Sequence, residues 1–578
     1  MAYRGKTIIC ILLSITFFSF VDANETDEKK HMMSELETIK NIFDFQYAPK
    51  AWKKEYFGWD LENEIEKSKQ CVLATNDITA KDFQIIVRNF FRSTRDYHVK
   101  VLFFSTETAF LPLEVKGANG RYFITHVNKS LLSTSQYPIQ AGDEVLLFHE
   151  RPINDVISEL QMEEFGTSGT GTDRSLTEHM LTNRLGVTGQ EVPRGPVSIQ
   201  VRHRANASIN TYQLIWSYTP EKMSNNLGVL TPFFDSREHK ATALKHFNKP
   251  WLTPYGWDDN FQYDSDNEDE FEDDEIKSPF ALGAKKTFMP TLGRIWWSND
   301  KKYWNACIFE TPGHQLVGYL RIPHYKDILG TSMDELKKII QLFEERTDAL
   351  VIDQVNNPGG MVFYMYAIAS LLTDQALHTP KHRMAIVHED VYNAVESIPL
   401  LEFVDSDRTA VKAFGKDISG YPISYQFAQH WLEFCRFISD QWKMGKKLTD
   451  PYHLYGVDHI NPNVYVRYTK PLLILINEMD FSCADFLPAI MQDNKRATIM
   501  GTQTAGAGGY VMTNMLNSRF GIAGFKITGS IANRPDNQPI ENLGVTPDIL
   551  YELTEEDYQH GFKNYKNAVL DTLNNMLK

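Results

Sequence analysis

The chain has 578 residues, of which 42% are hydrophobic and 23% charged, the composition of a folded protein with several domains. Its formal net charge of -15 argues against nucleic acid as the main partner, because phosphate binding requires a basic surface. Eleven acidic residues and no basic one lie between Asp258 and Glu275, so the rest of the chain is close to neutral.

The first residues have the pattern of an export signal. Arg4 and Lys6 precede an apolar run over residues 8–21, and a small-residue cleavage site follows at residues 21–23. The run is too short for a comfortable membrane span, so residues 1–23 predict a signal peptide, an exported protein and no stable membrane span. The remaining cysteines contain no CxxC pair, which indicates buried thiols, leaves one disulfide open and excludes a zinc pattern. They are Cys71, Cys307, Cys435 and Cys483.

Residues 24–110 predict a mainly helical N-terminal segment, in which ITAKDFQIIVRNFF is the clearest amphipathic piece. His98 directly precedes a strand-like apolar run, and on these residues alone a structural role for it is favoured over a catalytic one. Residues 111–219 predict a β-rich module, whose order of turn, strand, turn and helix resembles a PDZ domain; an ordinary β-meander is the alternative. Within it, GTSGTGTD (166–173) lacks the pattern of a phosphate loop and indicates a connector.

Residues 220–290 predict an acidic linker, because the composition turns polar, proline-containing and finally acidic. Residues 291–578 then alternate strand-like and helical pieces, which predicts a largely parallel sheet flanked by helices. Ser332 to Glu335 predicts a capping box at the start of one of these helices. His378 and His382 lie four residues apart without a third ligand nearby, so no metal site is expected there.

The core contains three junctions at which a strand is followed by residues suited to chemistry. Ser482 lies where the apolar run PLLILIN gives way to helical spacing, a position where free N–H groups favour an oxyanion. On this stretch alone, an N-cap is the favoured interpretation of Ser482, because serine is among the preferred N-cap residues. The other junctions are NNPGG (356–360), whose glycines allow close backbone approach, and GTQTAGAGG (501–509).

In this order the three junctions resemble the core of the carboxyl-terminal processing (tail-specific) serine peptidases. Those run strand, NxxGG, strand, a serine at a helix start, strand, and a GxxTxGKG loop whose lysine is the general base. Ala507 occupies the place of that lysine, so the matching position cannot supply a Ser-Lys dyad. The tricorn-like branch of the family uses Ser with His and an acid. YAPKAWKKEYFGWDL, RDYHV, INEMDFSCADF and ENLGVTPDI resemble that branch, and the resemblance covers nearly the whole chain.

The resemblance implies a crotonase-like α/β catalytic core that hydrolyses proteins or peptides without a cofactor or a metal. By position, it implies Ser482 as the nucleophile, His98 as the base and Glu541 as the acid. The oxyanion would be held by the N–H groups of Cys483 and of Gly359 or Gly360. It further implies a homodimer that acts on host proteins, and a zymogen whose segment between the two halves is cut out by the enzyme itself.

Two other classes of function compete with a serine endopeptidase. One is a catalytically inactive peptide-binding protein on the same scaffold, which the PDZ-like module permits. The other is a crotonase-type acyl-CoA enzyme, since that fold also places glycines at a strand-to-helix oxyanion site. The Ser482, His98 and Glu541 set counts against the first, and the lack of an evident basic patch counts against the second.

Overall fold

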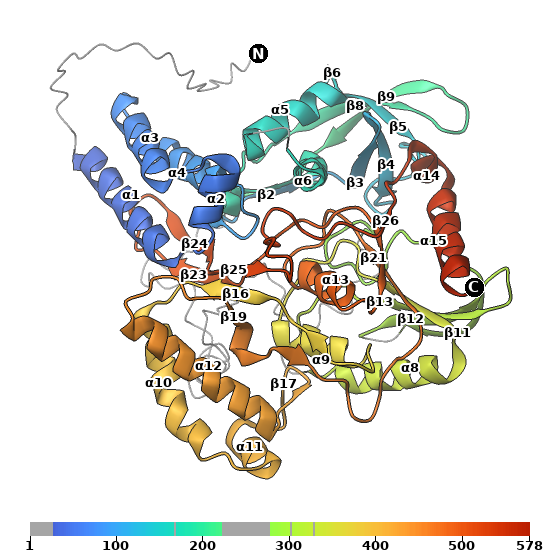
Figure 1. Cartoon of the computed structure of the whole chain (residues 1–578). Coiled ribbons are helices and arrows are strands. Elements are labelled where there is room, and N and C mark those ends of the chain that lie inside the picture. The colour runs from blue at the N-terminus through green and yellow to red at the C-terminus, as the bar shows by residue number, and fades with distance from the viewer. Residues whose placement is uncertain (1–26, 167–168, 222–277, 301–302, 328–329) are drawn as a thin grey trace.

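The computed structural model describes residues 27–166, 169–221, 278–300, 303–327 and 330–578. The predicted signal peptide and the acidic stretch lie outside the described residues. In the rest, a helical N-terminal segment and a β-rich module lie against a larger α/β core that the C-terminal half forms (Figure 1). This arrangement confirms the predicted fold class.

Four helices make up the N-terminal segment. The last of them, α4 (Ala80–Ser93), begins at a capping box between Thr79 and Asp82 and buries one apolar face. Its Phe91 ring packs against Phe525 of the C-terminal core, with the centroids 5.1 Å apart. The other helices are α1 (Asp27–Gln46), α2 (Lys50–Phe57) and α3 (Leu61–Ala74).

A three-stranded sheet ties this segment to the core. β1 (Lys100–Phe103) pairs antiparallel with β24 (Ile522–Thr528), which also pairs with β23 (Val511–Met515). The pairing places Val101 opposite Phe525. His98 lies just before β1, so this sheet carries it to the core across most of the sequence.

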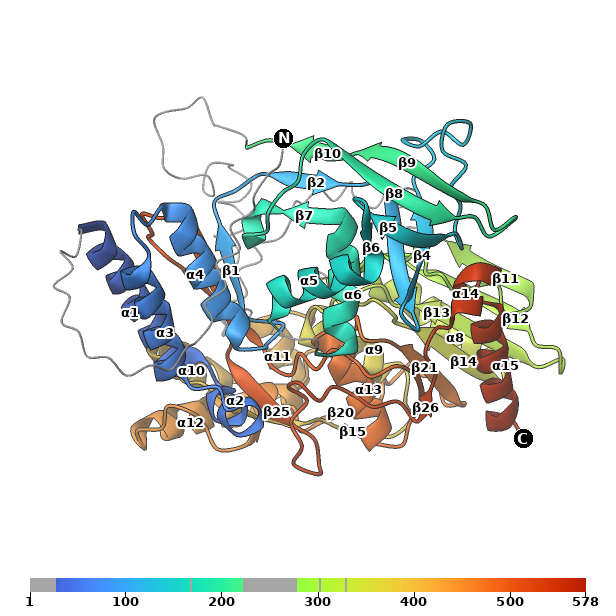
Figure 2. The same ribbon diagram turned by 90° about the horizontal axis from the view of Figure 1, so that it is seen from above.

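The β-rich module is built on a sheet of order β3-β4-β5-β8-β9, with β6 paired to β5. Within it, β8 and β9 pair antiparallel, from Pro196 opposite Ile215 to Arg202 opposite Ile209. Figure 2 shows α5 and α6 in the middle of the molecule, between the N-terminal helices and this sheet. The bounds are β3 (Leu113–Ala118), β4 (Arg121–Val127), β5 (Glu144–Phe148), β6 (Arg151–Pro152), β8 (Pro196–Arg202), β9 (Ile209–Ile215), α5 (Ile153–Phe165) and α6 (Gly171–Thr182). A smaller sheet joins β10 (Ser217–Thr219), β2 (Thr108–Phe110) and β7 (Asn183–Leu185), after which comes the 3-10 turn η1 (Gly186–Thr188).

The core sheet has seven strands in the order β11-β12-β13-β14-β21-β22-β26, and it is parallel from β13 onward. The two central strands are buried on both faces, which explains their unbroken apolar sequence. Leu472 and Ile474 face one layer of helices, while Leu473 and Leu475 pack with α15 on the other. The strands are β11 (Arg294–Asp300), β12 (Asn305–Glu310), β13 (Leu316–Arg321), β14 (Ala349–Asp353), β21 (Leu472–Ile476), β22 (Thr498–Gly501) and β26 (Ile549–Leu550). The helices are α8 (Met333–Arg346), α9 (Val362–Ser370), α13 (Cys483–Asp493), α14 (Glu555–His560) and α15 (Lys563–Met576).

Between β14 and β21 the chain makes a mainly helical excursion, most of which the sequence did not predict. Its helices pack against α9 through an aromatic cluster that includes Phe363, Phe427 and Tyr455. The helices are α10 (His388–Glu402), α11 (Asp407–Phe414), α12 (Tyr425–Lys443) and the 3-10 turn η5 (Leu454–Gly456). Short strands complete it: β15 (Leu377–His378) with β20 (His459–Ile460), β16 (Lys381–Met384) with β19 (Tyr452–His453) and β25 (Ser530–Asn533), and β17 (Asp417–Ile418) with β18 (Tyr421–Pro422).

Three local predictions need correction. The Gly-rich stretch is a connector only in its first half, because Thr170 and Asp173 form a capping box that starts α6. The capping box predicted at Ser332 is wrong: its hydroxyl hydrogen-bonds Tyr364 at 2.5 Å, so it does not cap α8. The predicted linker does not extend to residue 290, because its described end packs on the core and Phe280 is buried there.

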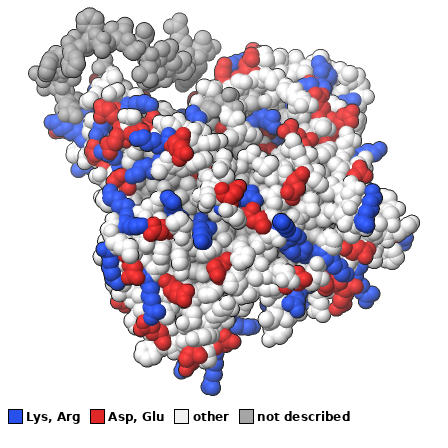
Figure 3. All heavy atoms as spheres, in the orientation of Figure 1, with Lys and Arg blue, Asp and Glu red and all other residues white. Residues whose placement is uncertain are grey.

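The structure also bears on the predictions about surface charge, membrane spans and disulfides. On the face in Figure 3, acidic and basic side chains are interspersed. No helix within the described ranges is long and apolar enough to cross a membrane. Cys435 and Cys483 are buried and Cys71 and Cys307 are half-buried, and none of these four described cysteines forms a disulfide.

Candidate active site

Ser482 lies at a sharp turn between β21 and α13. Its backbone has φ 57° and ψ -116°, a conformation that costs a non-glycine residue about 1–3 kcal/mol. Its hydroxyl makes no capping hydrogen bond, so the N-cap interpretation of Ser482 is wrong. Ser482 instead lies on a strained strand-to-helix connection, which is the backbone geometry of a nucleophile elbow.

The NNPGG loop lies directly against this turn. A Cβ on Gly359, which has φ 88°, would be 2.7 Å from Ser482 Cβ and 2.6 Å from the Phe481 carbonyl oxygen. The contact therefore requires glycine at position 359. The Phe481 N–H donates to the Asn357 carbonyl at 2.9 Å, which ties the two loops together.

Some backbone N–H groups around Ser482 already donate a hydrogen bond within the protein, and others do not. The Gly359 N–H donates to Asn357 Oδ1 at 2.8 Å. Within the described ranges, the N–H groups of Gly360 and Cys483 have no acceptor. Of the predicted oxyanion donors, Gly360 and Cys483 are therefore the two that remain available, while the Gly359 N–H holds its own loop. Cys483 Sγ also donates to the Gly360 carbonyl at 3.1 Å, which joins the two residues.

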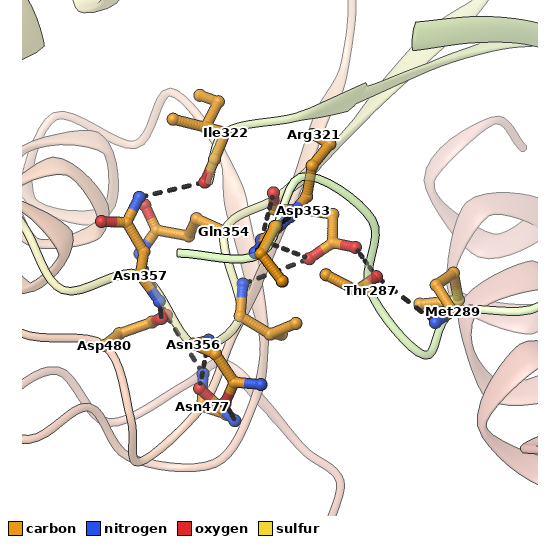
Figure 4. A network of polar contacts seen from close by, with 12 residues as sticks. Thr287, Met289, Arg321, Ile322, Asp353, Gln354, Asn356, Asn357, Asn477 and Asp480 are labelled. Atoms are coloured by element: carbon orange, nitrogen blue, oxygen red, sulfur yellow. Dashed lines mark hydrogen bonds and ion pairs between the residues drawn. The ribbon is translucent and has the colours of Figure 1, made fainter. Parts of the chain in front are cut away.

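Buried polar side chains hold the two loops in register (Figure 4). Asp480 accepts hydrogen bonds from the N–H groups of Asn357, at 2.9 Å, and Asn477, at 3.1 Å. Its second oxygen also accepts from Gln354 Nε2 at 3.2 Å. Burial raises the pKa of Asp480, and these hydrogen bonds oppose the rise. One carboxyl thus anchors both junctions.

The end of the predicted linker reinforces the same network. The Gly283 N–H donates to the Asn356 carbonyl at 2.9 Å, and Asn356 Nδ2 donates to the Phe280 carbonyl at 3.2 Å. Arg321, wholly buried, donates through Nη2 to the Ala284 carbonyl at 2.9 Å and through Nη1 to Asp353 Oδ1 at 3.3 Å. Residues 278–290 therefore support the base of the NNPGG loop.

The third junction, residues 501–509, is fastened to α13. Asp485 accepts from the N–H groups of Gly506, at 2.8 Å, and Ala507, at 3.0 Å. Burial raises the pKa of Asp485 to about 6. Ala507 is fully buried, so the place of the dyad lysine is filled by packed structure.

The segment that carries His98 contacts the Ser482 turn. Its neighbour Tyr97 packs edge-on against Phe481, with ring centroids 5.8 Å apart, and the His98 N–H donates to Asp96 Oδ1 at 2.9 Å. Burial lowers the pKa of His98 to about 4, although Asp96 opposes this. His98 Nδ1 is buried without a hydrogen-bond partner in the described part of the chain.

Glu541 is wholly buried behind the 501–509 loop. Its Oε2 accepts from the Gly508 N–H at 3.0 Å, and its Oε1 pairs with Lys53 Nζ at 2.6 Å. Among the described contacts, no hydrogen bond joins Glu541 or Ser482 to His98. The structure thus brings the His98 segment beside the Ser482 turn, and no described hydrogen bond joins the three side chains.

Sequence reasoning missed two residues of this region, Lys53 and Asp96. Asp96 is buried and accepts hydrogen bonds from Tyr47, at 3.0 Å, and Thr528, at 2.8 Å. Both residues lie in stretches quoted for the family resemblance, but no local pattern separates a buried Lys from a solvated one.

The β-rich module also reaches the Ser482 turn. The hydroxyls of Thr172 and Ser175, both in α6, donate to the carbonyl of Glu478 at 2.7 Å and to its Oε1 at 2.6 Å. Glu478 lies between β21 and Ser482, and its Oε2 accepts from Thr502 at 2.6 Å. The module and two of the three junctions therefore share one carboxylate.

No group of three or more His, Cys, Asp or Glu side chains in the described ranges is placed to hold a metal ion. His382 stacks on Phe486 and hydrogen-bonds Ser530 at 3.1 Å, whereas His378 packs near His459. A pocket of about 930 Å³ lies between the N-terminal helices and α5, and its lining includes Arg95 but not Ser482.

Comparison with known proteins places this geometry in a family. Residues 316–551 match the model of peptidase family S41, and residues 107–223 match a PDZ domain. A protein of Chlamydia muridarum is 34% identical over 97% of this chain and 95% of its own length. The solved structure of mature CPAF complexed with lactacystin is 30% identical, covers 95% of this chain and 99% of that one, and has a TM-score of 0.80.

The chain belongs to peptidase family S41. Its residues 316–551 contain all three junctions, and its β-rich module is a PDZ domain. A carboxy-terminal-processing protease of Bartonella bacilliformis is also 32% identical, over 14% of this chain and 18% of its own. As an S41 member the protein is a serine peptidase, which removes the basis for the acyl-CoA alternative.

Proposed function

We propose that the protein is a serine endopeptidase whose nucleophile is Ser482, with His98 as general base and Glu541 as the acid. The observation that carries this proposal is the strained Ser482 turn, packed on Gly359 and flanked by the two available N–H groups of Gly360 and Cys483. A peptidase nucleophile needs this combination of a hydroxyl at a fixed turn and preorganised donors for the oxyanion.

In the proposed reaction, His98 takes the proton of Ser482 Oγ as the hydroxyl attacks the substrate carbonyl. The Gly360 and Cys483 N–H groups then hold the oxyanion, and loss of one such donor costs on the order of 10²–10³ in rate. His98 passes its proton to the leaving amine, and water hydrolyses the acyl-enzyme by the same steps. The uncharged state of His98, favoured by its burial, suits a base.

Glu541 acts on His98 through an intervening water in this proposal. Both oxygens of Glu541 already accept hydrogen bonds, and His98 Nδ1 is buried without a described partner. A water between them would receive the Nδ1 proton and fix the tautomer in which Nε2 faces the nucleophile.

The proposal extends to how the enzyme is made and used. It is exported by its signal peptide, is synthesised as a zymogen, and activates by cutting itself between residues 225 and 290. Because residues 278–290 pack on the core, the cuts are expected before residue 278. A homodimer acting on host proteins is part of the same proposal, which rests on the family resemblance.

Two measurements on purified protein test the proposal. The wild type should degrade a casein-like substrate and, in intact-mass spectra over time, convert to two fragments, whereas Ser482→Ala should do neither. Cleavage of casein by pure Ser482→Ala protein would refute the nucleophile. An inactive wild type with a normal melting curve would favour the peptide-binding alternative. A fully active but uncut wild type would remove the zymogen.

A further inference from the structure

The carboxyl of Glu541 is paired with a lysine from the opposite end of the chain. Lys53 lies on α2, and both side chains are 0% exposed, with Nζ 2.6 Å from Glu541 Oε1. Nζ also donates to Asn542 Oδ1 at 2.7 Å and to the Arg95 carbonyl at 3.0 Å. Lys53 therefore connects the proposed acid to the segment that carries His98.

The hydrogen bonds of Lys53 and Glu541 fit an ionised pair. Lys53 Nζ has three acceptors around it, which matches the three N–H donors of an ammonium group. Both oxygens of Glu541 receive donors, from Lys53 and from the Gly508 N–H. A protonated Glu541 could donate its O–H only to an uncharged Lys53 Nζ, so the two groups change charge state together. The ionised state gives each of the three Nζ hydrogens one acceptor, and it is the state on which the inference rests.

Glu541 would not hold this charge by itself. Burial and the neighbouring carboxylate of Asp96 raise the pKa of Glu541, while Lys53 and the Gly508 N–H oppose the rise. A neutral Glu541 would stabilise the imidazolium of His98 poorly. Among the groups that oppose protonation of Glu541, the Lys53 cation on α2 has the largest effect.

We propose that Lys53 is a positioning residue, which keeps Glu541 an oriented carboxylate so that it supports His98. This inference rests on the proposed function of Ser482, His98 and Glu541. Ala507 stands where the related peptidases have a catalytic lysine. In this chain a lysine acts from another element and on the acid rather than on the serine.

The test is a double-mutant cycle with Lys53→Gln, Glu541→Gln and the double variant, measured as kcat/KM against pH. Lys53→Gln should lower kcat/KM at pH 7 by about 10²- to 10⁴-fold with little change in KM, as loss of the correct acid does in a triad. Its acid limb should move to higher pH, since Glu541 must then lose its proton without help. In the Glu541→Gln background, adding Lys53→Gln should lower kcat/KM by a further factor of less than about three. The two residues act as a unit, so the second substitution has little left to remove.

Other charges around His98 must be separated from this effect. Asp96, Lys100 and Lys526 act on His98, and the direct repulsion from Lys53 is weaker than from either of these lysines. Tyr47 hydrogen-bonds Asp96 at 3.0 Å. A direct effect of Lys53 on His98 would shift the acid limb equally with and without Glu541. That result, additive losses in the cycle, or an unmoved limb in Lys53→Gln would overturn the inference.

Lys54→Gln is the matched control, since Lys54 is the next residue on α2 and pairs with Asp60 at the surface. It should leave both kcat/KM and the acid limb unchanged. If Lys53→Gln does not fold, carbon-13 NMR of glutamate carboxyls in the wild type replaces it, with Glu541 assigned by difference from Glu541→Gln. Glu541 should be ionised at pH 6, and a protonated Glu541 would overturn the inference. Full activity in Glu541→Gln would instead mean that the proposed triad is wrong.

Discussion

The close contact between Gly359 and Ser482 makes Gly359→Ala a sharp perturbation. The new Cβ would lie 2.7 Å from Ser482 Cβ and 2.6 Å from the Phe481 carbonyl oxygen. Since carbon atoms pack best at about 3.5–4.0 Å, the two loops must separate by about 0.8 Å or more. A displacement near 1 Å in an active site costs about 10² in rate.

Gly415→Ala separates this clash from backbone strain. Gly415 follows α11 with φ 95°, close to the φ of 88° at Gly359, and a Cβ there would meet nothing within 4 Å. Both variants should lose about 1–3 kcal/mol of stability from the left-handed backbone. Only Gly359→Ala should lose activity, by about 100-fold in kcat/KM on a casein-like substrate.

Melting curves and kinetics on the two variants decide the matter. If Gly359→Ala kept kcat/KM within about threefold of Gly415→Ala, the reasoning that the NNPGG loop sets the position of the nucleophile would be refuted.

Three further predictions concern the acid limb, the module and the thiol. Burial lowers the pKa of His98 to about 4, so the base should stay unprotonated until the pH falls well below neutral. The fall of kcat/KM at acid pH should therefore have its midpoint below pH 6.5. A midpoint at or above the usual histidine value would contradict this. Ser175→Ala removes the hydroxyl that donates to Glu478 Oε1 at 2.6 Å, so it should lower stability by about 0.5–1.5 kcal/mol and lower kcat. The control Ser133→Ala, at an exposed site, should change neither stability nor kcat. Burial raises the pKa of Cys483 to about 12, so iodoacetamide at pH 8 should alkylate half-buried Cys71 well before it; equal rates in peptide mapping would contradict the burial of Cys483.

The parts of the fold that the sequence predicted are those with strong local signals. The apolar run before Ser482 is β21, buried on both faces, and the helical spacing after it is α13. Alternating strands and turns likewise predicted the PDZ domain. These signals are local, because strand and helix periodicities are set by which faces are buried.

What the sequence did not predict depends on contacts between distant segments. The Lys53 and Glu541 pair joins residues 488 positions apart, and nothing in KAWKKEYF separates Lys53 from its exposed neighbour Lys54. The Gly359 N–H donates to the Asn357 side chain, which leaves the Gly360 N–H as the available oxyanion donor. The sequence could not show this, because the contact exists only in the folded loop. The capping pattern at Ser332 failed for the same reason, since Tyr364 takes the hydroxyl.

The most direct test of the account is to map the site of a fluorophosphonate adduct. The wild type should take up one adduct, on the peptide that contains Ser482, and lose peptidase activity in proportion. Ser482→Ala should take up none and melt at the wild-type temperature, because its hydroxyl makes no capping hydrogen bond that could be lost. An adduct on another residue that abolishes activity, or an active Ser482→Ala protein, would contradict the assignment of Ser482 as the nucleophile.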